Sequence, residues 1–178
     1  MKTKILSLAA AFALIPTIAS AHNIEVGKVL PAATVSEGGI ASVSGDDVDF
    51  NKWNTAQLPT SGTTVIIAAA ARPSANEMTP EDLNEKLENS KNIKYYKLVN
   101  GDDAPFGAGV FIKGAIKDGK VAKPNVETVL DDNGEVFYEW DLQPESSAVV
   151  VLKDGKVAYV HEGTITDAEK SEVLKQIM

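Results

Sequence analysis

Short runs of apolar, β-branched residues mark the expected strands of this chain. The clearest run, residues 63–70, follows Gly62 and contains Val65, Ile66 and Ile67, which predicts a central strand buried on both faces. Further strands are expected at residues 94–99, 127–130, 148–152 and 157–160. The last two runs are separated by residues 153–156, which include the turn residues Asp154 and Gly155. These two runs therefore predict a hairpin.

Helical spacing and capping residues mark the expected helices. Thr79 followed by Pro80 predicts a helix start, with Leu83 and Leu87 on its apolar face. Residues 110–117 predict a short helix, and Thr166 with Glu169 forms the capping pattern of a last one. Residues 27–49 predict short strands and turns, and residues 131–134 a turn. This order predicts an α/β fold, a mixed β-sheet flanked by helices.

The N-terminus has the pattern of a secretory signal peptide. Lys2 and Lys4 precede a mostly apolar stretch, residues 5–18, and small residues occupy positions 19–21. We expect cleavage after Ala21, which leaves residues 22–178 as one periplasmic domain of 157 residues (178 minus 21). The apolar stretch is short for a bilayer-spanning helix, and we expect no membrane span after cleavage.

Composition removes several classes of function. The chain has no cysteine, so thiol-disulfide exchange, cysteine nucleophiles and thiolate metal sites are excluded. Without residues 1–21 it carries 15 basic and 25 acidic residues, a formal charge of −10, which argues against a nucleic-acid partner. We expect no cofactor.

The order of elements resembles that of the thioredoxin fold, as found in exported thioredoxin-like reductases and peroxiredoxins. In those relatives paired redox cysteines follow the central strand, where this chain has Ala71 and Ser74. A proline that packs beside the cysteines is replaced here by Ser146 and Ser147. The resemblance therefore implies a redox position that is structurally present and chemically empty.

A closer resemblance is to the YtfJ family of exported bacterial proteins. It is carried by residues 53–54 and 56–58, Arg72 and Ser74, Asn100, residues 102–104, Gly107 and Gly109, and residues 145–152. These positions span nearly the whole chain after residue 21. They imply a thioredoxin-like fold and no particular activity.

Arg72, the only arginine of the chain, is the main candidate for a binding residue. It lies at the expected strand-to-helix turn, where a guanidinium fork and helix N–H groups favour anions. Together with Ser74 it predicts a site for an anionic group such as a peptide carboxylate. The alternative is an ordinary ion pair of Arg72 with another acidic residue of this acidic chain or with Asp102 or Asp103, and a purely capping role for Ser74.

Asp102 and Asp103 follow the second expected strand, at the sheet edge where open α/β sheets bind ligands. Paired carboxylates can act as acid and base or hold a hard cation, but no calcium-loop pattern is present and turn residues are the simpler interpretation. His22 and His161, the only histidines, are a weak basis for a copper site. Trp53 and Trp140 are expected in the core.

Two hypotheses follow. The first is a non-catalytic binding module that holds a periplasmic protein, a peptide or a small anion through Arg72, Ser74, Asp102, Asp103 and residues 146–147. The second is a carboxylate- or metal-dependent hydrolase centred on Asp102 and Asp103.

Overall fold

The computed structural model describes residues 22–45 and 47–178. The predicted signal peptide, residues 1–21, lies outside this range, so its cleavage stays a prediction. Within the described part of the chain, no helix has the length and apolar character needed to cross a membrane.

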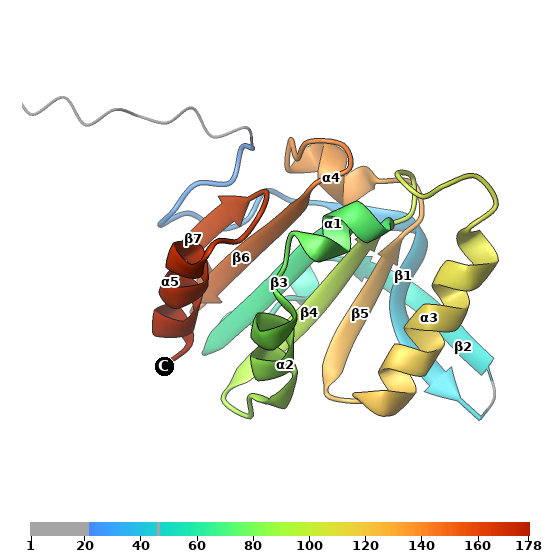
Figure 1. Cartoon of the computed structure of the whole chain (residues 1–178), viewed down its shortest axis with the longest axis horizontal. Helices are drawn as coiled ribbons and strands as arrows, with labels where there is room; N and C mark the ends of the chain where they lie inside the picture. Colours follow the sequence, from blue (N-terminus) through green and yellow to red (C-terminus); the bar gives the residue numbers. More distant parts are fainter. Residues whose placement is uncertain (1–21, 46) are drawn as a thin grey trace, which may run out of the picture.

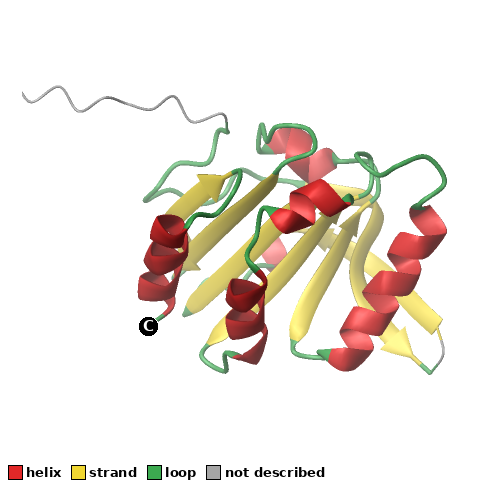
Figure 2. Ribbon diagram, in the orientation of Figure 1, coloured by secondary structure: helices red, strands yellow, loops and turns green. Residues whose placement is uncertain are grey.

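One seven-stranded mixed sheet runs through the described residues in the order β2-β1-β5-β4-β3-β6-β7 (Figures 1 and 2). Its strands are β1 (Thr34–Ser44), β2 (Asp47–Asn54), β3 (Thr63–Ala70), β4 (Ile93–Asn100), β5 (Val126–Asp131), β6 (Ser147–Lys153) and β7 (Lys156–Glu162). Strands β3, β4 and β5 are parallel to one another, whereas β6 pairs antiparallel with β3 and β7 with β6. The predicted central strand, the strand after it and the hairpin are confirmed.

Burial explains why β3 lies in the middle. Its side chains at Val65, Ile66 and Ala68 are at most 1% exposed, and Val149 and Val150 of β6 are fully buried beside them. The backbone of such a strand finds all its hydrogen-bond partners only between two neighbouring strands. Its apolar side chains leave water only when both faces of the sheet are covered. The apolar pattern therefore specifies the strand and its central place together.

Helices cover both faces of the sheet. The described helices are α1 (Pro73–Glu77), α2 (Glu81–Asn89), α3 (Gly109–Ala122), α4 (Glu135–Glu139) and α5 (Asp167–Ile177), with a 3-10 turn at Thr55–Gln57. Figure 1 shows α1, α2, α3 and α5 on the near face and α4 behind the sheet. The far-face core contains both tryptophans, Trp53 and Trp140, as expected. The near-face core packs Leu83 and Leu87 of α2 against the sheet.

The predicted helix near Thr79 is confirmed one residue later along the chain, but the predicted capping role of Thr79 is wrong. Two helices occupy this region, and α2 begins at Glu81 after Pro80, which caps it without a side-chain hydrogen bond. Thr79 is buried, and its hydroxyl lies 3.4 Å from that of Ser147. Thr79 therefore connects the segment between α1 and α2 to the sheet. Its hydroxyl contacts Ser147 instead of capping the helix, because tertiary packing competes with the local capping pattern.

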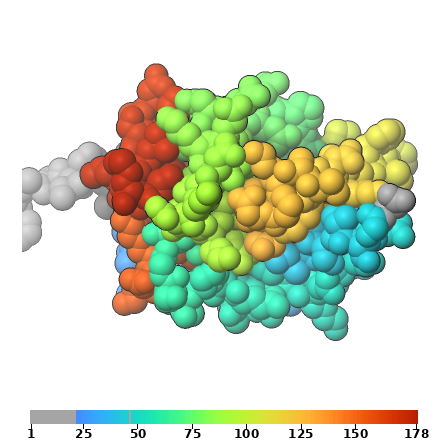
Figure 3. Space-filling view, turned by 90° about the horizontal axis from the view of Figure 1, so that it is seen from below, coloured from blue at the N-terminus to red at the C-terminus, as the bar shows by residue number. Residues whose placement is uncertain are grey.

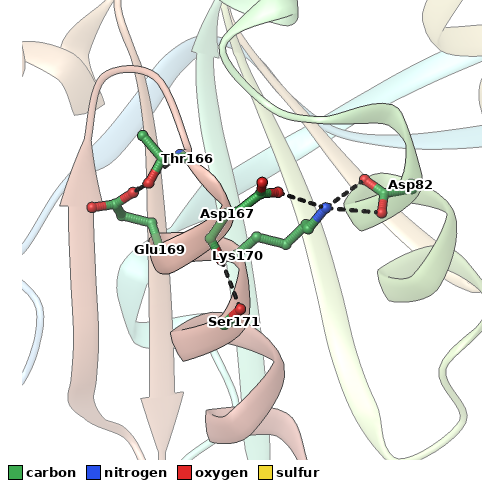
Figure 4. Close-up of polar contacts among 6 residues, drawn as sticks. All are labelled: Asp82, Thr166, Asp167, Glu169, Lys170 and Ser171. Atoms are coloured by element: carbon green, nitrogen blue, oxygen red, sulfur yellow. Dashed lines mark hydrogen bonds and ion pairs between the residues drawn. The ribbon is translucent and has the colours of Figure 1, made fainter.

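The C-terminal helix follows the predicted capping pattern. Thr166 and Glu169 form a reciprocal capping box at the start of α5, drawn in Figure 4. One turn later, Lys170 donates to the Asp82 carboxylate of α2 and also lies 3.3 Å from Asp167. We call this contact between the two helices the α2–α5 junction.

The N-terminal strands are longer than predicted and depend on two glycines. Gly38 and Gly39 have φ angles of +94° and +115° and lie in the segment of β1 that pairs with β5. A Cβ at Gly38 would overlap the Leu130 carbonyl oxygen, and one at Gly39 the Asn51 carbonyl oxygen. Only glycine allows this approach of three strands. Figure 3 views the molecule from the end where β3 begins. It shows the hairpin of β1 and β2 in cyan beside α3.

Candidate functional site

The ends of three parallel strands and the start of β6 meet at one edge of the sheet, which we call the carboxyl edge. Ala70, Asn100 and Asp131 end β3, β4 and β5, and Asn100 lies opposite both of the other two in register. Ala70 N–H also donates to the Ser146 carbonyl oxygen at 3.0 Å. The sequence-predicted residues of the loops after β3 and β4 and before β6 are therefore brought to the same edge.

Arg72 lies there, but its partners differ from the expected ones. Its Nε donates to the backbone carbonyl of Asp103 at 2.8 Å, and its guanidinium nitrogen lies 2.6 Å from Glu145 Oε1. Arg72 therefore forms the ion pair that was weighed as the alternative and reaches Asp103, but it pairs with Glu145 and contacts the Asp103 carbonyl, not the carboxylate of Asp102 or Asp103. The Arg72 side chain is 26% exposed and that of Glu145 58% exposed, so the acid is the more accessible partner.

The Asp103 carboxylate is engaged by other groups. It accepts hydrogen bonds from the Asn100 amide at 2.9 Å and from the Glu145 backbone N–H at 3.0 Å. Asn100 in turn accepts from the Asp102 N–H at 3.0 Å. This network holds the loop after β4 against the loop before β6, and it presents the Asp103 carbonyl to Arg72. We call Arg72, Asn100, Asp103 and Glu145 the arginine clasp.

Glu145 also has an unusual backbone conformation. Its φ is +60°, in the left-handed region that residues with a Cβ seldom adopt. The hydrogen bond from its N–H to Asp103 holds it there, and its carboxylate is directed to Arg72. Backbone strain of this kind is concentrated at binding and catalytic sites.

The remaining predicted residues do not join the clasp through their side chains. Ser74 is exposed in the first turn of α1. Ser146 is buried and donates its hydroxyl to Glu162, while Ser147 is buried with its hydroxyl near that of Thr79. The serine pair at the expected proline position therefore packs into the structure rather than lining the same contact as Arg72.

Asp102 belongs to a different cavity. It is exposed and lines a shallow depression of about 490 Å³ with Gly134, Glu135 and Tyr138. The two aspartates thus point to separate surroundings. In the described residues no group of three or more acidic or histidine side chains has a metal-binding arrangement.

Asp131, the buried carboxylate at the end of β5, is a polar residue of this edge that the sequence pattern did not indicate. It was predicted as part of a turn, yet it is fully buried and accepts from the N–H groups of Glu135 and Val136 at 2.9 and 2.8 Å. Burial raises the pKa of Asp131, while the N–H donors of α4 lower it by a smaller amount. The signal was available in principle, because Asn100 and Asp131 are polar residues that end two adjacent parallel strands.

An apolar groove begins beside the clasp. It has a volume of about 510 Å³ and is lined by residues of α1 and α3 and of strands β3, β4 and β5 beneath them. Arg72 and Pro73 border it on one side and Phe111 on the other, and Lys97 and Val99 of β4 lie between. The sequence did not indicate this groove, since it arises from the spacing of two helices that are far apart along the chain.

Comparisons with known proteins agree with this architecture. The model of a family described as bacterial protein of unknown function (YtfJ_HI0045) matches residues 24–178. An uncharacterized protein of Haemophilus influenzae is 35% identical over 161 residues, covering 88% of this chain and 87% of the relative. The uncharacterized protein YtfJ of Escherichia coli is 34% identical over 166 residues, covering 90% and 89%.

Solved structures place the fold. The thioredoxin domain of a thiol-disulfide oxidoreductase from Bacteroides vulgatus has a TM-score of 0.56 at 18% identity, with 87% of this chain and 99% of that chain covered. A DsbF homologue from Corynebacterium diphtheriae has a TM-score of 0.52 at 13% identity, with 94% and 98% covered. At such identities the likeness shows the fold alone, and it confirms the predicted thioredoxin-like sheet.

Proposed function

This chain belongs to the YtfJ_HI0045 family of bacterial proteins, and we propose that it is an exported, non-redox binding module that recognises an anionic group at the arginine clasp. The absence of cysteine removes the chemistry of the thioredoxin-like oxidoreductases and leaves their fold. The N-terminal pattern supports export to the periplasm. Intact-mass analysis of the protein from its native host should show a chain that begins at His22, and a mass that retains residues 1–21 would contradict export.

The arrangement of Arg72 carries the proposal. Its Nε is anchored on a backbone carbonyl, so the guanidinium keeps its position when the other partner leaves. That partner, Glu145, is a carboxylate on an exposed side chain. An incoming carboxylate or similar anion would take over the contact that Glu145 now makes, with the same charge-assisted geometry. Glu145 then acts as an internal occupant of the anion site.

The hydrolase alternative is less well supported by this geometry. Acid–base or metal-assisted hydrolysis needs carboxylates that converge on one reacting group. Asp103 is instead hydrogen-bonded to Asn100 and the Glu145 N–H, and Asp102 lines another cavity. The two side chains serve the loop more directly than a reaction.

A single arginine makes the anion site measurable. The protein has one arginine Nε–Hε signal in its nitrogen–proton correlation spectrum, since Arg72 is unique. We expect titration with acetate to shift that signal in a saturable way, and Glu145→Gln to increase the affinity for acetate several-fold by removing the competing charge. Signals of α5 serve as the internal control.

Variants of Arg72 provide the decisive comparison. Arg72→Ala should abolish saturable acetate shifts of the neighbouring backbone signals, and Arg72→Lys should restore little, because an ammonium lacks the guanidinium fork. The exposed Arg72–Glu145 pair contributes about 0–1 kcal/mol, and Arg72→Ala also removes the hydrogen bond to the Asp103 carbonyl, which contributes about 1–3 kcal/mol. The melting temperature should therefore fall by several degrees while the protein still folds. Unchanged acetate binding in Arg72→Ala would remove the clasp from the binding site.

A further inference from the structure

The groove beside the clasp is lined mainly by small and apolar residues. Small side chains line its walls, among them Ala69, Ala71 and Ala115, and α3 adds Ile112 and the helical glycine Gly119. A Cβ placed on Gly119 would meet no atom within 4 Å. The small residues thus leave room over the sheet that side chains of this protein do not fill.

Aromatic and aliphatic side chains are exposed at one rim of the groove. Phe111 of α3, a lining residue, is 79% exposed, and its neighbour Val110 is 82% exposed. Exposed aromatic residues beside a concave apolar surface are typical anchors in protein recognition. The rim therefore favours an apolar ligand over a polar one.

The charge of the groove selects among apolar ligands. Its lining includes two cations, Arg72 and Lys97, and no acidic residue, although the whole chain has a formal charge of −8. Each cation is paired with an acid that is not among the lining residues, Arg72 with Glu145 and Lys97 with Glu88. An apolar ligand that carries one carboxylate fits this distribution, with its anion at Arg72.

Polar groups along the groove favour a peptide over a simple hydrocarbon chain as the ligand. Asn76 of α1 and Thr128 of β5 are among the lining residues, on either side of the apolar floor. A polypeptide needs hydrogen-bonding partners at intervals along its backbone, whereas an alkyl chain does not. Asn76, which is exposed, offers both a donor and an acceptor.

We propose that the groove between α1 and α3 binds the carboxyl-terminal end of a polypeptide whose last residues are apolar. The terminal carboxylate replaces Glu145 at Arg72, and the last side chains occupy the space beside Ala115 and Gly119. This inference rests on the anion site proposed above and names the ligand that the site receives.

Fluorescence anisotropy with the purified protein tests it. The probe is a fluorescein-labelled decapeptide of polar residues that ends in three leucines with a free carboxylate. Two matched probes carry a terminal amide or end in three serines. We expect the leucine peptide with the free carboxylate to bind at least tenfold more tightly than either matched probe.

Two glycines of α3 provide a matched pair of variants. Gly119→Leu fills the groove, whereas Gly114→Leu adds the same side chain to the same helix at a position outside the groove lining. Neither Cβ would meet an atom within 4 Å, so both variants are expected to fold. Gly119→Leu should weaken binding of the leucine peptide at least tenfold, and Gly114→Leu should leave it unchanged.

The outcomes separate this inference from the anion site. Equal binding by the two glycine variants, equal binding of the leucine and serine probes, or no binding at millimolar concentration overturns the groove as a peptide site. Tighter binding of dodecanoate than of the leucine peptide replaces the peptide with a fatty acid and also overturns it. In all of these cases a loss of acetate binding in Arg72→Ala would still uphold the anion site, and its persistence would reject that site as well.

Discussion

Two regions of this protein join segments that are distant in sequence, and they do so in different ways. At the carboxyl edge, side chains bond to backbone: Arg72 to the Asp103 carbonyl, Asp103 to the Glu145 N–H and Asp131 to the N–H groups of α4. At the α2–α5 junction, the Lys170 side chain meets the carboxylates of Asp82 and Asp167.

The difference shows how each region constrains its loops. A side chain that hydrogen-bonds to the backbone of a loop fixes that loop whatever the side chains of the loop do. When such a side chain is buried, its removal leaves backbone N–H groups without a partner. Charged side chains that meet at the surface lose entropy in pairing and are screened by salt. The carboxyl edge is therefore built to hold its shape, while the junction adds a weaker contact between helices already held by the core.

The largest expected effect comes from Asp131. Asp131→Ala removes both acceptors from the buried N–H groups of Glu135 and Val136 and should lower the free energy of unfolding by about 2–4 kcal/mol. Asp132→Ala is the matched control, because the adjacent Asp132 side chain is 35% exposed and lies 4.0 Å from Lys113. Urea unfolding of the three proteins compares them, and equal midpoints would show that the α4 cap contributes nothing.

The same variant should reveal the raised pKa of Asp131. Because burial raises that pKa in the folded state, folding takes up a proton between the ordinary value of 3.8 and the raised one. The stability of the natural protein should therefore fall, relative to Asp131→Ala, as the pH rises through this window. Unfolding curves at several pH values above 3.8 test the sign, and a cost of the substitution that grows with pH would contradict it.

The smallest expected effect is at the α2–α5 junction. The hydrogen bond from Lys170 lowers the pKa of Asp82, and burial has a smaller effect in the opposite direction. Lys170→Met should return that pKa toward 3.8, which a titration of the Asp82 carboxyl carbon by NMR measures. The melting temperature should fall slightly in low salt and hardly at all in 1 M salt. A salt-independent loss would mean that packing of the lysine stem, not its charge, joins the helices.

Much of the fold could be predicted because its signals are local. The apolar run of β3, the turn at Asp154 and Gly155, and the capping box of Thr166 and Glu169 each act within a few residues. The predictions failed where distant groups compete. Thr79 faces Ser147 instead of capping a helix, and Asp131 caps α4, which the pattern of residues 131–134 did not indicate.

The candidate site was predictable in position but not in its contacts. Arg72 and Asp103 were expected at one edge of the sheet, and they lie there. The partner of Arg72 could not be chosen from sequence, since Asp102, Asp103 and Glu145 all offer carboxylates and only the path of the backbone selects among them. Glu145 reaches Arg72 because its backbone has a left-handed φ angle. A glutamate at this position gives no sign of that conformation in the sequence.

The pairing of β1 with β5 has a consequence for the order in which the chain folds. The β1–β2 hairpin joins neighbouring residues, whereas the pairing of Gly38 with Asp131 closes a loop of 93 residues (131 minus 38). Closing long loops is slow, and local pairs form first. We therefore expect the β1–β2 hairpin to dock onto β5 late in folding. Gly38 and Gly39 then let the backbones of β1, β2 and β5 approach one another without an intervening Cβ.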